Sequence, residues 1–89
     1  MSGNDTRTNA AEDLATEAVV LDRVISVHPI VLNVDELIRE LAGEDADFAR
    51  RDAIERAVDE LSGIGLMHKR DGFLSPTRAA LRFSELAER

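Results

Sequence analysis

Apolar residues recur at helical spacing in four segments of the chain. The clearest stripe is Ile54, Ala57, Val58 and Leu61. These positions follow the i, i+3, i+4, i+7 pattern of a helix with one face in a core. We therefore predict a central helix over about residues 47–62.

The two ends of this central helix carry recognisable signals. Asp47 is a candidate N-cap that would turn Phe48 into the core, whereas Asp52 and Glu55 have the capping-box spacing of a shorter helix. The longer helix is the expectation taken here. At the other end, Gly63 is expected at C′, with Ile64 packing back on the last turn.

The first helix is expected over residues 10–27. Asn9 and Glu12 have capping-box spacing, and Pro29 disfavours helical geometry at the residue before it. Two apolar stripes run along this segment, one of Leu14, Ala18, Leu21 and Ile25 and the other of Val20, Val24 and Val27. A helix apolar over so much of its circumference needs partners on more than one side. It is either the central helix of the domain or part of a dimer interface.

A short strand and a second helix follow. Residues 30–32 are aliphatic and too few for more than a short strand. Asn33 with Glu36 forms a capping box, and Leu32 and Leu37 occupy the positions of a hydrophobic staple. The helix that begins here is expected to end at Gly43.

A β-hairpin is predicted over about residues 66–75. Asp71 and Gly72 lie between two short apolar runs, and a type I′ turn needs positive φ at both central residues. A loop of two residues and a loop of three both fit. Ser75 and Pro76 read as N-cap and N1 of a last helix that runs to about residue 88. Its expected inner face is Ala79, Phe83 and Leu86, with Leu81 on the other side.

Composition narrows the function classes. The chain has 89 residues, which suits one domain over residues 10–89, preceded by a disordered tail over residues 1–9. The absence of cysteine excludes disulfides and thiolate metal sites and favours a cytoplasmic protein. No apolar run is long enough to cross a membrane. No residue pattern indicates catalysis, a cofactor or a metal site, so we expect a protein that is not an enzyme.

Charge is unevenly distributed along the chain. The net charge is −7, and residues 1–46 hold three basic and ten acidic groups, whereas residues 47–89 hold eight of each. A nucleic-acid-binding protein normally presents a basic field. In this chain the excess of negative charge lies in residues 1–46, and residues 47–89 are neutral overall with small basic clusters.

The order of the expected elements resembles a known family. The order helix, strand, helix, helix, hairpin, helix is similar to the winged helix-turn-helix fold of small bacterial transcriptional regulators. Three segments carry this resemblance: Val34 to Leu41, Ala53 to Lys69, and the turn Arg70-Asp71-Gly72. It implies a mainly α protein with a small β-hairpin, in the α+β class, with element order α-β-α-α-β-β-α.

The resemblance also implies a function and a site. In that family the second helix of the pair enters the major groove and the wing contacts the adjacent DNA backbone. The residues at those positions are Arg50, Arg51, Arg56, Lys69 and Arg70. The implied function is a regulator that binds double-stranded DNA. The apolar circumference of the first helix and the outward Leu81 separately allow a homodimer through the first and last helices, at Val19, Val20 and Leu81.

A second hypothesis is a winged-helix module that binds another protein through its acidic first half. It rests on the excess of carboxylates in residues 1–46 and on the acidic residues of the central helix. The arrangement of the five cations separates the two hypotheses. One positive patch would favour DNA, and scattered positions would favour protein docking.

Overall fold

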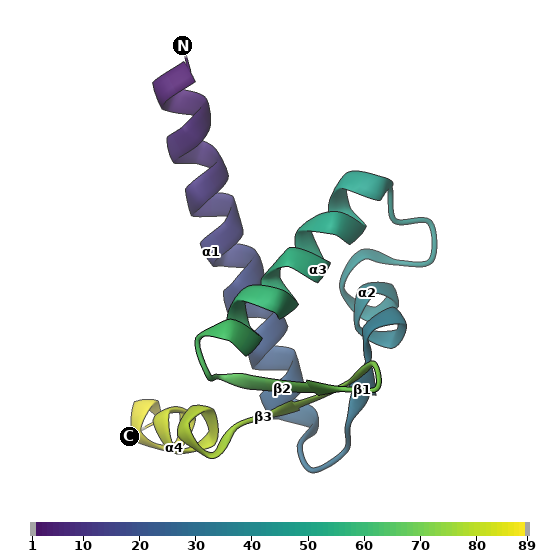
Figure 1. The fold of residues 1–89 in the computed structure, drawn as a ribbon, viewed down its shortest axis with the longest axis vertical. Coiled ribbons are helices and arrows are strands. Elements are labelled where there is room, and N and C mark those ends of the chain that lie inside the picture. Colours follow the sequence, from purple (N-terminus) through teal and green to yellow (C-terminus); the bar gives the residue numbers. More distant parts are fainter. Residues whose placement is uncertain (1, 89) are drawn as a thin grey trace.

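The computed structural model describes the backbone of residues 2–88 and the side chains of residues 10–88. Four helices and three short strands make up the fold (Figure 1), in the expected order and in the α+β class. They are α1 (Ser2–Val27), β1 (Leu32–Asn33), α2 (Val34–Ala42), α3 (Phe48–Gly63), β2 (Met67–Arg70), β3 (Phe73–Pro76) and α4 (Arg78–Ala87). None of the helices within residues 2–88 combines the length and apolar character needed to cross a bilayer.

The strands form one antiparallel sheet with β3 in the middle, in the order β1-β3-β2. Arg70 pairs with Phe73 across the hairpin, so the loop has two residues, Asp71 and Gly72. Both have positive φ, 54° and 82°, which a type I′ turn requires. The predicted hairpin is confirmed, and the open choice of loop length is decided in favour of two residues.

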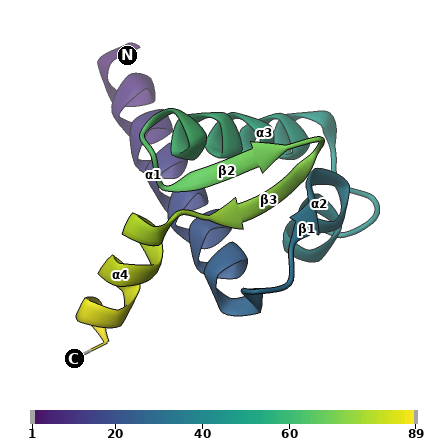
Figure 2. The ribbon, with the colours of Figure 1, turned by 60° about the horizontal axis from the view of Figure 1, so that its bottom comes forward.

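The core lies where α1, α2 and α3 meet the inner face of the sheet (Figure 2). It is built from Val20, Val24, Leu32, Leu37, Ile38, Ile54, Ala57, Val58, Leu61, Met67 and Leu74. The predicted stripe of α3 is therefore confirmed as its buried face. Leu32 lies opposite Leu74 in the sheet, so β1 ties the start of α2 to the hairpin.

The expected caps of α2 and α3 are present. The Asn33 side chain accepts a hydrogen bond from the Glu36 N–H, and the Glu36 carboxylate accepts one from the Asn33 N–H. Asp47 accepts a bond from the N–H of Arg50, which confirms the longer α3. Phe48 is 84 % exposed, so the expectation that it turns into the core is wrong. As the first residue of α3, it precedes the turn at which that helix reaches the core.

The C′ glycine of α3 lies two residues later than expected. Gly63 is still helical, and Gly65 takes the positive φ of 87°. The N–H of Leu66 donates to the Leu61 carbonyl and the N–H of Gly65 to the Ser62 carbonyl, which is the Schellman pattern. Ile64 is 56 % exposed, and Leu66 instead packs against the core. Gly65 therefore takes the C′ position that was expected of Gly63, and β2 begins two residues later at Met67.

The first helix and first strand also differ from expectation. Helix α1 begins at Ser2, so the segment expected to be a tail continues the helix, and Met1 lies outside the described residues. A capping-box pattern permits a start but does not force one, since a helix that continues satisfies the same N–H groups. Strand β1 is Leu32–Asn33 and not residues 30–32, because only these two residues lie opposite β3.

Helix α4 begins later and is less buried than expected. Ser75 and Pro76 belong to β3, where Pro76 pairs with Met67, and the N-cap is Thr77, which accepts a bond from the Ala80 N–H. Ala80 is the buried residue of α4, whereas Phe83 and Leu86 are mostly exposed. The expected inner face is therefore wrong, because α4 projects away from the sheet and touches the body near its start (Figure 2).

The capping box of α2 gives a stability prediction. Replacing Asn33 by Ala should lower the free energy of unfolding by about 1 kcal/mol, since the N–H of Glu36 loses its acceptor. For a domain of this size that corresponds to a fall in Tm of roughly 4–8 °C, measurable by circular dichroism. Asn33→Asp keeps an acceptor and should stay near the wild type. Equal losses in both variants would show that the cap bond is not the cause.

Candidate functional site

Two of the three candidate arginines of α3 are held by carboxylates. Arg51 lies 3.7 Å from Asp35 of α2. Arg56 lies 3.0 Å from Asp52 and 3.3 Å from Asp13 of α1. The hydrogen bond with Asp52 and the charge of Asp13 raise the pKa of Arg56 above its usual value. These guanidinium groups therefore neutralise acidic neighbours instead of forming a free positive surface.

The third arginine of α3 faces a different direction. Arg50 lies in the first turn and lines a hollow between α1 and α3, together with Glu12, Asp13 and Arg56. Across this hollow the carboxylates of α1 face the guanidinium groups of α3. Arg50 is therefore directed toward α1, whereas Arg51 is directed toward α2.

The two cations of the hairpin point to opposite faces of the sheet. Lys69 pairs with the buried Leu74 and Arg70 with the exposed Phe73, and neighbouring residues of a strand alternate between faces. Lys69 reaches to within 3.7 Å of Asp59 of α3. Arg70 has no ion pair among the described residues. The five candidate cations thus do not form one positive patch.

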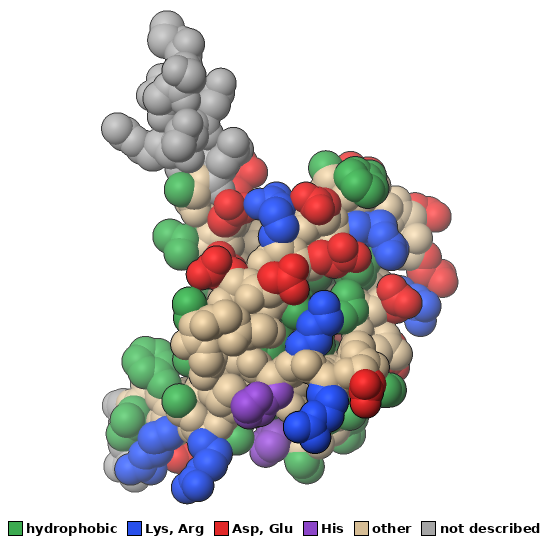
Figure 3. Space-filling view, in the orientation of Figure 1, with side chains coloured by type: hydrophobic (Ala, Val, Ile, Leu, Met, Phe, Trp, Pro, Cys, Tyr) green, Lys and Arg blue, Asp and Glu red, His purple; other side chains and the backbone are tan. Residues whose placement is uncertain are grey.

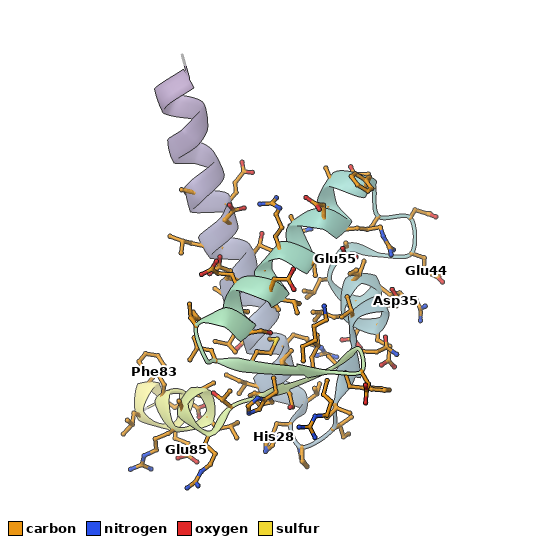
Figure 4. The ribbon with its side chains drawn as sticks, in the orientation of Figure 1. His28, Asp35, Glu44, Glu55, Phe83 and Glu85 are labelled. Atoms are coloured by element: carbon orange, nitrogen blue, oxygen red, sulfur yellow. The ribbon has the colours of Figure 1, made fainter. Side chains whose placement is uncertain are left out.

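Helices α2 and α3 and the loop between them carry an excess of acidic residues. Residues 34–63 hold ten carboxylates and four arginines, a net charge of −6. Asp and Glu side chains gather over α3 in Figure 3, and Figure 4 labels Asp35, Glu44 and Glu55 on this side of the molecule. Asp35 and Glu44 line one hollow with Arg39 and Arg51. We call the surface of Asp35, Glu44, Asp52, Glu55 and Asp59 the acidic face.

An aromatic side chain lies next to the acidic face and was not expected there. Phe48, the first residue of α3, is 84 % exposed and precedes Asp52 by one helical turn. The sequence contained a signal for this, because Phe48 stands outside the i, i+3, i+4, i+7 stripe of Ile54 and Leu61. An exposed aromatic ring beside charged groups is typical of the anchor residues of protein interfaces.

Positive charge is found at the other end of the chain. Residues 64–89 hold five basic and three acidic groups, whereas residues 1–63 carry a net charge of −9. His68, Lys69, Arg70 and Ser75 line a shallow hollow on the hairpin. Blue and purple side chains gather along the lower edge of Figure 3, over the hairpin and α4. Net negative charge therefore lies on residues 1–63, and the segment that contains the hairpin and α4 carries a small net positive charge.

Among the described side chains, no group of three or more His, Cys, Asp or Glu is arranged to hold a metal ion. Comparison of the chain with models of protein families, with curated proteins and with solved structures gives no match.

Proposed function

We propose that this chain is a winged-helix-type module that acts by binding another protein, and that the acidic face is the surface that docks. The order of elements and the two-residue wing turn support the winged-helix assignment. The net charge of −6 on the α2–α3 pair is the observation that carries the functional proposal.

Electrostatics argues against α3 as a helix that reads the major groove. A protein binds duplex DNA mainly by neutralising phosphates with Lys and Arg, and uncompensated carboxylates at the contact repel the phosphates. On α3, where such a helix would carry cations, Glu55 has no ion pair among the described residues, and Asp52 and Asp59 hold Arg56 and Lys69. The pairs that Arg56 and Lys69 form would also have to break before either side chain could reach a phosphate.

The same surface suits a cationic protein partner. Carboxylates such as Glu55, which has no ion pair among the described side chains, would attract Arg and Lys side chains. Complementary charge speeds association and sets orientation. Phe48 supplies apolar area that can be buried in a pocket of the partner. The partner that this chemistry selects is a basic, amphipathic surface with an apolar site about one helical turn from its cations.

A peptide titration tests this function. We expect a helical peptide with Arg at i and i+4 and a neighbouring Leu to shift the amide resonances of residues 48–59 of the ¹⁵N-labelled protein. D52N/E55Q/D59N should reduce the affinity at least tenfold, since exposed charge contacts add up over a small interface. Phe48→Ala should weaken binding in the same assay while leaving Tm unchanged, because Phe48 is exposed.

The matched control for that experiment is E85Q/E88Q on α4, which removes two exposed carboxylates outside the acidic face. This variant should bind the peptide like the wild type. The proposal fails if the control loses as much affinity as the triple variant, or if the shifts fall outside α2 and α3.

One observation favours a second candidate function, duplex DNA binding by the hairpin. Arg70 projects from the outer face of the sheet near its tip, without an ion pair among the described residues, and His68 lies on the same face two residues earlier. Cations at a loop tip suit contacts to a phosphate backbone. Under this hypothesis the β2–β3 hairpin contacts the DNA and α3 contributes little to binding.

The second candidate makes its own prediction. K69A/R70A should weaken binding to a mixed-sequence duplex and lower the slope of log K against log salt by about one to two, since roughly one counterion is released per phosphate contact. R51A/R56A removes the same formal charge from α3 and should change the slope less, because both side chains are paired with carboxylates. Fluorescence anisotropy at several salt concentrations measures the affinity and the salt slope of each variant. A wild-type protein that does not bind the duplex at low salt rules this candidate out.

A further inference from the structure

The outer face of the sheet is a surface that no described helix covers. Figure 2 looks onto this face, with β2 and β3 in front of α1 and α3. An apolar groove between α1 and α4 is also open, and its lining includes Leu21, Ile25 and Phe83, with Asp22 as its charged residue. The groove is mostly apolar, whereas the sheet face combines rings, a cation and a hydroxyl group. The chemistry of the sheet face is therefore the more selective.

Two ring side chains lie next to each other on this face. Leu74 of β3 is buried against the core, and neighbouring residues of a strand alternate between faces, so Phe73 and Ser75 face outward. Arg70 lies opposite Phe73, and His68 lies opposite Ser75. His68 and Phe73 are therefore diagonal neighbours across the two strands, a relation that places such residues roughly 7–8 Å apart.

Both rings are accessible from solvent. Phe73 is 47 % exposed, and His68 is also exposed. His68, Arg70 and Ser75 line the shallow hollow on the hairpin, next to Phe73. A shallow hollow with a ring on either side of a cation admits a flat group that lies on the rings, and it does not enclose a compact ligand.

One cation of the hairpin is available on this face. Residues 67–76 hold two basic groups, Lys69 and Arg70, and one carboxylate, Asp71. Lys69 is engaged on the other side of the sheet by Asp59, whereas Arg70 has no ion pair among the described residues. A guanidinium group binds phosphate oxygens well. With a single free cation, however, the rings must provide most of the binding free energy.

The bases of a single-stranded nucleic acid suit this arrangement. Aromatic side chains that stack successive bases, beside a cation that contacts the backbone, are the means by which proteins bind single strands. The bases of a duplex are stacked on one another, so their flat faces are not accessible to rings on a sheet. An acidic peptide could pair with Arg70, but its carboxylates have no flat face to lie on both rings.

We propose that the outer face of the β2–β3 hairpin binds single-stranded nucleic acid. One base stacks on Phe73, a neighbouring base stacks on His68, and the guanidinium group of Arg70 contacts the backbone phosphate. This binding does not depend on the docking function of the acidic face, and it needs no dimer. Val20, expected from the sequence at a homodimer contact, is fully buried in the core and cannot make one.

Substitutions of Phe73 test the stacking in the full chain. The chain has no Trp and no Tyr, so Phe73→Trp places a single indole on this face. Its fluorescence should fall when an oligothymidylate of about 12 nucleotides binds, because a base stacks on it. Phe73→Leu keeps an apolar side chain without a ring, and it should weaken binding roughly tenfold in fluorescence anisotropy. Phe73→Tyr restores a ring and should bind like the wild type.

Two further variants separate this site from the rest of the surface. Asp71→Asn removes the carboxylate of the hairpin and should strengthen binding about twofold, since Asn-Gly also forms a type I′ turn. Phe48→Leu is the matched control, because it changes an exposed phenylalanine next to the acidic face and should leave binding unchanged. Circular dichroism checks that each variant is folded.

The salt dependence and two competing ligands complete the test. The slope of log K against log salt should be about −0.7, since one phosphate of a single strand is neutralised. The proposal is overturned if the wild type does not bind the oligothymidylate at up to about 1 mM, or if Phe73→Leu binds like the wild type. It is also overturned if the indole fluorescence does not change at saturation. Equal affinity for a mixed-sequence duplex or for a polyglutamate peptide would show that the face reads negative charge alone, which likewise contradicts it.

Discussion

The packing of α1 against α3 is the interaction on which the other features of this structure depend. Val20 and Val24 lie on one side of that contact, and Ile54 and Val58 lie on the other, all fully or nearly fully buried. The hairpin closes the core from below through Met67 and Leu74, and Leu32 ties α2 to it. Because a chain of 89 residues buries few side chains, each carries a large share of the stability. This contact therefore decides which residues of α1 and α3 face solvent.

The same contact accounts for the position of the acidic face. With its buried stripe turned to α1 and the sheet, α3 must present the carboxylates between those positions to solvent, and its arginines reach the nearest carboxylates on either side. The hairpin lies below α3, so its cations are separated from the acidic face, apart from the reach of Lys69 to Asp59. The acidic face and the outer cations of the hairpin therefore lie on separate parts of the surface.

The apolar surface between α1 and α4 is a consequence of how the chain leaves the sheet. Pro76 remains in β3 and Thr77 caps α4, so the last helix starts beyond the sheet and is directed away from the core. Had the helix begun at Ser75 and Pro76, as the local pattern suggested, it would have started inside the span of β3. Phe83 and Leu86 are therefore carried on a helix that begins outside the sheet, and both remain exposed.

Local signals in the sequence determined the number, type and order of the elements, the cap of α2, the long α3 and the hairpin turn. Each depends on residues within about four positions of one another, such as Asn33 with Glu36 or Asp71 with Gly72, so neighbouring side chains and backbone torsions decide them. Only the tertiary structure determined which glycine takes the C′ position of α3 and at which residue β3 ends and α4 begins. It also determined which carboxylates pair with the arginines of α3. Those outcomes depend on residues far apart in the chain, as in the pairs of Arg56 with Asp13 and Lys69 with Asp59, because only the packed helices bring such charges within reach.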